Sequence, residues 1–179
     1  MGDWVALLRG INVGRAKRVP MADLRAIYAG LGFTDVATIL NSGNAVFGHD
    51  ETTGPAPDAA ILRKAVQDAT GVDSETIVLP ADRFRRIAEA NPLRQGERDP
   101  RRLGVSFAAG PLDPAAADVP TGIEPEELVV TADAVYQWLP NGVLASPVPP
   151  GFWKRLGSTV TSRNDATVQK VIALLDARR

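Results

Sequence analysis

The residues best suited to bind a charged ligand stand in a short basic loop near the start of the chain, residues 9–18. The loop follows an apolar run, Trp4 to Arg9, that is typical of a buried strand, and it precedes a helix whose first position suits Pro20. Backbone N–H groups and the helix dipole favour anions at such a junction. The side chains that add donors are Arg9, Asn12, Arg15, Lys17 and Arg18. We expect an anion-binding loop, with a solvated surface connection as the alternative.

The glycines of this loop exclude two common phosphate-binding motifs. Gly10 and Gly14 are its only glycines, so the dinucleotide fingerprint is incomplete, and the Gly-Lys-Ser/Thr ending of a Walker A loop is missing. An arginine fork suits either carboxylate or phosphate. The pattern therefore predicts a small anionic ligand without naming it.

Two further polar clusters could reach a ligand. The first, Asn41-Ser42-Gly43-Asn44, is a hairpin turn signal, and Ser42 and Asn44 are its candidate ligand-binding residues, with simple turn chemistry as the alternative. The second, Thr161-Ser162-Arg163-Asn164, precedes a predicted helix. There Asn164 suits the N-cap, whereas Arg163 is either solvated or in contact with a ligand.

These clusters lead to one hypothesis about a site. We expect that the polar side chains of the clusters converge on one cleft between the two halves of the protein, with the alternative that each serves its own turn or cap. The candidate ligand-binding residues are Arg9, Asn12, Lys17, Ser42, Asn44, Arg163 and Asn164.

No catalytic constellation is visible in the sequence. Cysteine is absent and His49 is the single histidine, which excludes thiolate chemistry and zinc sites built from several histidines. His49 stands in a polar stretch with Asp50 and Glu51, where we expect it to be exposed. No serine lies in a Gly-x-Ser-x-Gly elbow. We expect no metal and no cofactor, and the sequence leaves open whether the protein is an enzyme.

The charge balance is near neutral overall but segregated along the chain. The net charge is −1 and the isoelectric point is near 5.8, which argues against general nucleic-acid binding. Residues 80–102 are basic, whereas residues 103–149 hold acidic residues and no basic one. Such segments either form a positive face or neutralise one another.

The first 80 residues follow the order strand, helix, strand, strand, helix, strand. Apolar residues with helical spacing include Leu24, Tyr28 and Leu31 in the first helix and Ile61, Leu62 and Val66 in the second. Strands are expected at 4–9, 36–40, 45–47 and 77–79. This order is that of the ferredoxin-like split βαβ fold.

Residues 81–179 predict a looser version of the same half. Helices are expected at 82–90 and near the C-terminus, where Val168, Val171, Ile172 and Leu175 form an apolar stripe. Strands are expected at 103–107, 128–131, 135–139 and 143–146. The predicted fold class is therefore α+β, with two ferredoxin-like halves, 1–80 and 81–179, each with an antiparallel sheet.

Several segments resemble a bacterial family known as domain of unknown function 1697. The motifs that carry the resemblance are Ala6-Leu-Leu-Arg-Gly-Ile-Asn-Val-Gly14, Val19-Pro-Met21, Leu31-Gly-Phe33, Ser42-Gly-Asn44, Asn91-Pro92, Lys154-Arg-Leu-Gly157 and Thr161-x-Arg163-Asn164-x-x-Thr167-Val168. This sequence has Asp165 where the family commonly has Trp, and Leu40-Asn41 where Gln-like residues are common. The resemblance implies two ferredoxin-like subdomains in a cytosolic protein with no assigned activity.

Three functions are consistent with these observations. The first is binding of a small phosphate- or carboxylate-bearing ligand, and the second is a non-catalytic protein-interaction or regulatory module. The third, an enzyme acting on a phosphorylated substrate, lacks a visible base or nucleophile. The aromatic positions of the predicted sheet are too few for RNA stacking to be more than a minor alternative. No apolar run approaches the ~18 residues of a membrane span, so we expect a cytoplasmic location without membrane contact.

Overall fold

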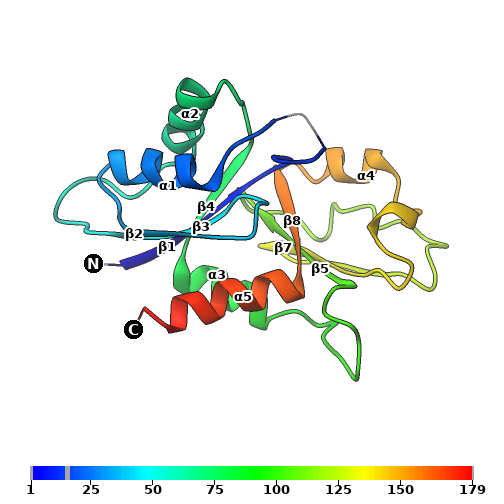
Figure 1. Cartoon of the computed structure of the whole chain (residues 1–179). Helices are drawn as coiled ribbons and strands as arrows, with labels where there is room; N and C mark the ends of the chain where they lie inside the picture. Colours follow the sequence, from blue (N-terminus) through cyan, green and yellow to red (C-terminus); the bar gives the residue numbers. More distant parts are fainter. Residues whose placement is uncertain (1, 15–16, 179) are drawn as a thin grey trace. The chain divides into compact units, whose positions relative to one another are not determined.

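The computed structural model describes residues 2–14 and 17–178, and it divides into two compact units. The first unit comprises Met1–Phe84 together with the C-terminal residues from Lys170 onward, and the second comprises Arg85–Gln169. Both units contain a four-stranded antiparallel sheet with helices, which gives the α+β architecture of two similar halves (Figure 1).

The first unit has the strand order β2-β3-β1-β4. Its elements are β1 (Gly2–Leu8), α1 (Met21–Gly30), β2 (Thr34–Ile39), β3 (Asn44–His49), α2 (Ala59–Thr70) and β4 (Thr76–Pro80). The central strand β1 pairs with β3 through Val5↔Val46 and with β4 through Val5↔Leu79. This is the antiparallel order of the split βαβ fold.

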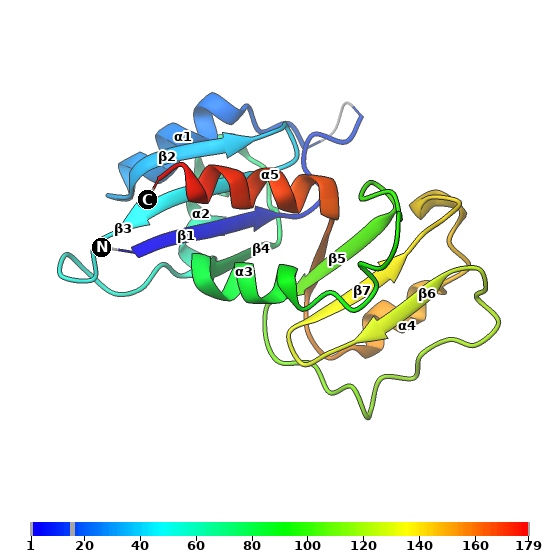
Figure 2. The same ribbon diagram turned by 90° about the horizontal axis from the view of Figure 1, so that it is seen from below.

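The helices α1 and α2 cover one face of this sheet. Leu24 and Tyr28 of α1 and Leu62 and Val66 of α2 pack with Phe47 of β3 in one buried cluster. Leu31 and Ile61, which we expected on the apolar faces, are exposed, because they lie at the end and on the outer side of their helices. The C-terminal half of α5 (Asp165–Asp176) lies against the opposite face of the sheet (Figures 1 and 2).

The second unit repeats the strand order but not the helices. Its sheet runs β6-β7-β5-β8, and α4 (Pro150–Arg155) is the helix between β7 and β8. The strands are β5 (Leu103–Ala108), β6 (Glu127–Val130), β7 (Ala134–Trp138) and β8 (Val160–Asn164), and α3 (Ala81–Glu89) comes before β5.

A proline-rich segment replaces the first helix of the second unit. Residues 109–126 contain four prolines, and proline removes a helical hydrogen bond and clashes with the preceding turn. The segment is held to the core by Leu112 and Ile123, which are buried together with Val135 and Phe152. The core of this unit is therefore closed by a chain segment without regular structure.

Two local predictions in the second half were wrong. Val143–Ala145 forms a short 3-10 helix, η1, and not a strand, because it lies between Gly142 and Pro147 with too few residues to pair. The fourth strand is β8, at residues 160–164, whereas we expected the fourth strand at 143–146 and only a helix start after Asn164. Its residues pair with β5 through Phe107↔Thr161 and Val105↔Arg163.

The last helix confirms most of its predicted stripe. Val168, Val171 and Leu175 are buried, whereas Ile172 is partly exposed. Among residues 2–14 and 17–178, no helix is long and apolar enough to cross a bilayer.

Candidate functional site

The loop between β1 and α1 is closed by Asn12. The Asn12 Nδ2 donates to the Val19 carbonyl (2.8 Å) and to the Asn41 carbonyl (2.7 Å), and its Oδ1 accepts from the Val19 N–H (2.9 Å). Asn12 adopts a positive φ of 56°, a conformation that asparagine tolerates better than most residues. Its side chain therefore bonds the backbone of two loops, and the amide holds the loop in shape.

The β2–β3 turn packs directly against the same loop. Gly43 has φ 76°, and a Cβ there would lie 2.7 Å from Leu8 Cβ and 2.9 Å from Ile11 Cδ1. The Gly43 carbonyl accepts from the Leu8 N–H (2.9 Å). Only glycine fits this close approach.

Asn44 and Ser42 organise this turn from within. The side chain of Asn44 is fully buried, and its Nδ2 donates to the Ile39 carbonyl and to Ser42 Oγ, both at 2.9 Å. Ser42 is exposed at the tip of the turn. Of these two candidate residues, only Ser42 presents a side chain to solvent.

A hollow of about 300 Å³ opens where the loop enters α1. It is lined by Asn12, Gly14, Arg18, Val19, Pro20, Met21 and Asn41. Within the described residues, no side chain caps the first turn of α1, and its first intrahelical bond is Leu24 N–H to the Pro20 carbonyl (3.0 Å). The earlier N–H groups of such a turn have no intrahelical partner. The hollow thus combines a helix start with an exposed arginine, Arg18.

Arg9 and Lys17, the other cations of the loop that the structure describes, do not line this hollow. Arg9 is exposed, and its backbone is fixed by the bond from Arg9 N–H to the Glu75 carbonyl (2.8 Å) and by Ser74 Oγ, which donates to the Arg9 carbonyl (2.9 Å). Lys17 is exposed with φ 50°. Arg15 lies outside the described residues.

An ion-pair group on α2 and the loop after it lies near Lys17. Arg63 binds Asp73 and Glu75. The hydrogen bond from Arg63 lowers the pKa of the Asp73 carboxyl below its usual value, and the charge of Lys17 contributes to the shift. Lys17 and Asp73 therefore attract each other electrostatically.

Arg163 and Asn164 belong to the second unit. Arg163 lies inside β8, where its Nη1 donates to Thr161 Oγ1 (3.1 Å) and to the Ser162 carbonyl (2.8 Å). Burial lowers the pKa of the Arg163 guanidinium to about 10. Asn164 Oδ1 accepts from the Thr167 N–H (2.9 Å), which is an N-cap bond at the start of α5.

Backbone N–H groups at the start of α5 already have hydrogen-bond acceptors within the protein. The Ala166 N–H donates to the Pro100 carbonyl (3.2 Å), and the buried carboxylate of Asp165 forms an ion pair with Arg94. Asp165, which stands where the resembled family commonly has Trp, is therefore a buried acid paired with an arginine.

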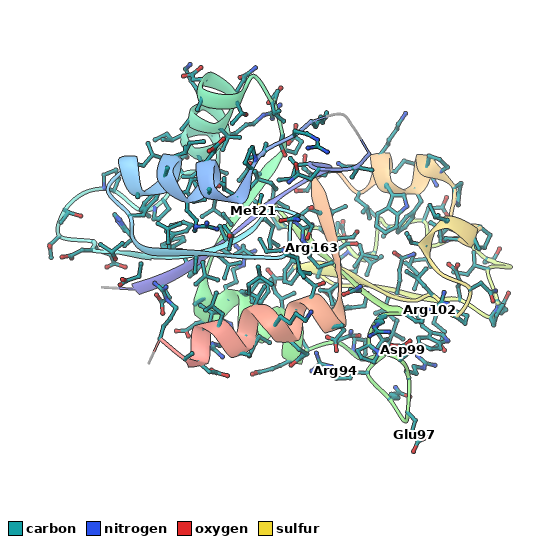
Figure 3. The ribbon with its side chains drawn as sticks, in the orientation of Figure 1. Met21, Arg94, Glu97, Asp99, Arg102 and Arg163 are labelled. Carbon is teal, nitrogen blue, oxygen red and sulfur yellow. The ribbon has the colours of Figure 1, made fainter. Side chains whose placement is uncertain are left out.

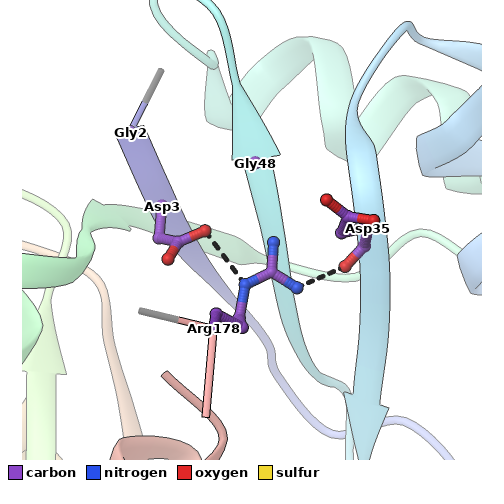
Figure 4. Close-up of a pocket in the computed structure, with 5 residues that line it drawn as sticks. All are labelled: Gly2, Asp3, Asp35, Gly48 and Arg178. Carbon is purple, nitrogen blue, oxygen red and sulfur yellow. Dashed lines mark hydrogen bonds and ion pairs between the residues drawn. The ribbon is translucent and has the colours of Figure 1, made fainter. Parts of the chain in front are cut away.

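A second hollow, of about 440 Å³, lies at the end of the first sheet, where Arg178 approaches β1 and β2. It is lined by Gly2, Asp3, Asp35, Gly48 and Arg178. Arg178 Nε donates to Asp3 Oδ1 (3.0 Å), and its Nη1 donates to the Asp35 carbonyl (Figure 4). The Arg178 side chain is only 14% exposed and links the residues after α5 to β1 and β2. We call this group of bonds the Arg178 clasp.

The single histidine is not exposed as expected. His49 is 6% exposed, because β3 continues to it through the pair Gly2↔His49. Its ring meets Phe33 edge to face at 5.8 Å, and no described residue accepts from or donates to its Nε2. No cluster of three or more potential metal-ligating side chains occurs in the described part of the chain.

A sequence profile described as "Protein of unknown function (DUF1697)" matches residues 1–136, about three quarters of the chain. The chain belongs to the DUF1697 family. A solved structure titled "The structure of conserved bacterial protein SP0830 from Streptococcus pneumoniae" is similar to this DUF1697 protein over 97% of this chain and 98% of that one. The TM-score is 0.65 and the sequence identity 22%, so the likeness concerns the fold. No curated protein matches the sequence.

Proposed function

We propose that the protein binds a small anionic ligand, bearing phosphate or carboxylate, in the hollow at the start of α1. The observation that carries the proposal is the helix start without a side-chain cap, which lines the hollow together with Arg18. Free N–H groups and the helix dipole attract negative charge there. The site is built from residues of the first unit alone.

Each side chain then has a separate role. Arg18 is the direct contact, because its guanidinium offers a fork of donors to an oxyanion. Asn12 is a positioning residue, since its amide bonds the backbone of Val19 and of Asn41, which both line the hollow. Arg9 and Lys17 add positive potential at a distance and raise the local concentration of anions.

One carboxylate opposes the proposed ligand. Asp23 lies in the first turn of α1. Its negative charge interacts favourably with the helix dipole and therefore competes with a bound anion. Removing that charge with Asp23→Asn leaves the shape of the side chain nearly unchanged. The variant should therefore bind an anion more tightly than the wild type.

Thermal unfolding in the presence of inorganic phosphate, nucleotides and phosphorylated metabolites tests the proposal. A ligand at about 100 times its Kd stabilises the native state by roughly 2.7 kcal/mol through mass action. We expect a rise in Tm for at least one compound, a larger rise for Asp23→Asn and none for Arg18→Glu. Lys64→Glu on α2 is the matched charge control, and its response should equal that of the wild type. No rise across the panel at millimolar ligand, or an equal rise in Arg18→Glu, would refute the proposal.

A further inference from the structure

The second unit carries a hollow of its own, of about 560 Å³. It is lined by Asp99, Arg101, Arg102, Asn141, Gly142, Val143 and Leu144. These residues come from the loop before β5 and from the turn and η1 after β7. Figure 3 shows Asp99 and Arg102 at the base of the first loop, with Glu97 pointing away from them at its tip.

Two adjacent aliphatic side chains stand open beside this hollow. Val143 is 69% exposed and Leu144 is 101% exposed, which makes them the most exposed apolar pair of neighbours in the described chain. They follow Gly142 in the short helix η1, which has no buried residue. Apolar residues exposed singly are common on protein surfaces, whereas these two are adjacent and both line the hollow.

The same hollow holds two arginines whose charge is not neutralised. Arg101 and Arg102 form no ion pair with any residue in 2–14 or 17–178. Asp99 forms no ion pair with either arginine. Its Oδ1 instead accepts from the backbone N–H of Arg101 (2.8 Å) as part of a turn.

The nearby Arg98 gives the contrast. It pairs with Glu127, donates to the Leu93 carbonyl and lies 4.9 Å over the ring of Trp138. The Arg98 guanidinium is therefore bound within the second unit, whereas the guanidinium donors of Arg101 and Arg102 form no ion pair with any described residue.

The backbone keeps the arginine and the aliphatic pair together. The Leu139 N–H donates to the Arg102 carbonyl (2.8 Å), and the Gly142 N–H donates to the Leu139 carbonyl (2.9 Å). A Cβ at Gly142 would lie 2.6 Å from Arg102 Nη1, so the guanidinium rests directly on the glycine. These contacts join the two segments that line the hollow.

We propose that this hollow docks an acidic segment of another protein that presents an aliphatic side chain next to carboxylates. The Arg101 and Arg102 guanidiniums would bind the carboxylates, and Val143 and Leu144 would cover the aliphatic group. Charge complementarity selects this partner, because the hollow contributes two unpaired cations and one carboxylate already engaged in a turn. A free phosphate would use the arginines and leave the aliphatic pair in water.

Methyl NMR with two synthetic peptides tests the docking site. The first peptide carries leucine between aspartates in a Gly-Ser frame, and the second has lysine in place of each aspartate. With the acidic peptide, we expect the Val143 and Leu144 methyl signals to shift and to reach saturation. The Kd obtained from these shifts should be about 1 mM or lower. The lysine peptide should leave these signals unchanged.

Variants separate docking from nonspecific attraction. Arg101→Glu with Arg102→Glu should abolish the shifts, and Leu144→Ser should weaken binding at least tenfold, whereas Lys154→Glu and Ile61→Ser are matched controls that should bind like the wild type. Circular dichroism checks that each variant is folded.

Three results would overturn this proposal. They are no methyl shift with the acidic peptide, equal shifts with the lysine peptide or phosphate, and a self-association of the wild type that the Arg101→Glu, Arg102→Glu variant lacks. The last result would identify a second copy of the chain as the occupant. Arg18→Glu leaves this hollow unchanged, so failure here and failure of the proposed anion site are distinguishable.

Discussion

The two units have the same strand order but close their sheets differently. In the first unit a polar loop leads into α1, whereas in the second unit residues 109–126 hold four prolines and form no helix. The first unit therefore has an open helix start beside Arg18, and the second has Arg101 and Arg102 beside an exposed aliphatic pair. One strand order therefore supports two kinds of surface, because the connections between the strands differ.

Truncating one buried leucine in α1 and one in the proline-rich segment shows whether the two segments contribute equally to the stability of their cores. Leu24→Ala removes a fully buried side chain from a helix, and we expect a loss of about 4 kcal/mol in the free energy of unfolding. Leu112→Ala should cost about 2 kcal/mol, because an irregular segment can collapse into the cavity. Urea denaturation of both variants provides the comparison. Equal losses would show that the irregular segment is packed as rigidly as the helix.

The next effect compares one glycine in each unit. Gly43→Ala places a Cβ against Leu8 and Ile11 at a positive φ, and we expect a cost of about 3 kcal/mol. Gly142→Ala also has a positive φ, but its Cβ meets only the flexible end of Arg102, so a cost of about 1 kcal/mol is expected. Thermal unfolding measures both. A Gly142→Ala variant as unstable as Gly43→Ala would show that η1 is more rigidly held than its contacts suggest.

A smaller effect concerns the asparagines of the two loops. Asn12→Ala leaves the partly buried backbone N–H and carbonyl of Val19 without the Asn12 side chain as their partner. We therefore expect a loss of about 1–2 kcal/mol in the free energy of unfolding. Asn141→Ala changes an exposed side chain and should stay within about 0.5 kcal/mol of the wild type. Denaturant midpoints measured at equal slopes decide the matter. Equal stability of the two variants would contradict the role of Asn12 as the tie of the loop.

The smallest effect is the dependence of stability on pH through Asp73. The hydrogen bond from Arg63 lowers the pKa of this carboxyl below its usual value, so the ion pair stabilises the native state at pH above the unfolded pKa. That contribution is lost as the pH falls through the lowered native pKa. Arg63→Met should flatten this part of the acid unfolding curve, with Arg25→Met as the control. An unchanged curve would place the acid sensitivity of the first unit elsewhere.

The sequence predicts most elements of the fold because their apolar residues have clear periods. Leu24 and Tyr28 repeat at helical spacing, and the turn at Asn41–Asn44 separates two apolar runs. The misses have physical causes. β8 contains Thr161 and Ser162 and lies at the edge of its sheet, so it lacks an apolar alternation, whereas Val143–Ala145 is apolar but has no strand partner.

The candidate site was less predictable because a residue type does not reveal which group its side chain meets. Asn12 and Asn44 have the donors expected of a ligand site, yet both amides bond the backbone of nearby turns. Arg101 and Arg102 were visible only as part of a basic segment. The proposed role of these arginines depends on Leu144, which lies roughly forty residues further along the chain and lines the same hollow.

Backbone amide NMR with inorganic phosphate shows whether an anion binds at the start of α1. We expect saturable shifts of the Met21, Ala22 and Asp23 amides in the wild type and their loss in Arg18→Glu. Shifts confined to other positions, such as the Arg178 clasp, or unchanged shifts in Arg18→Glu, would contradict the proposed anion site.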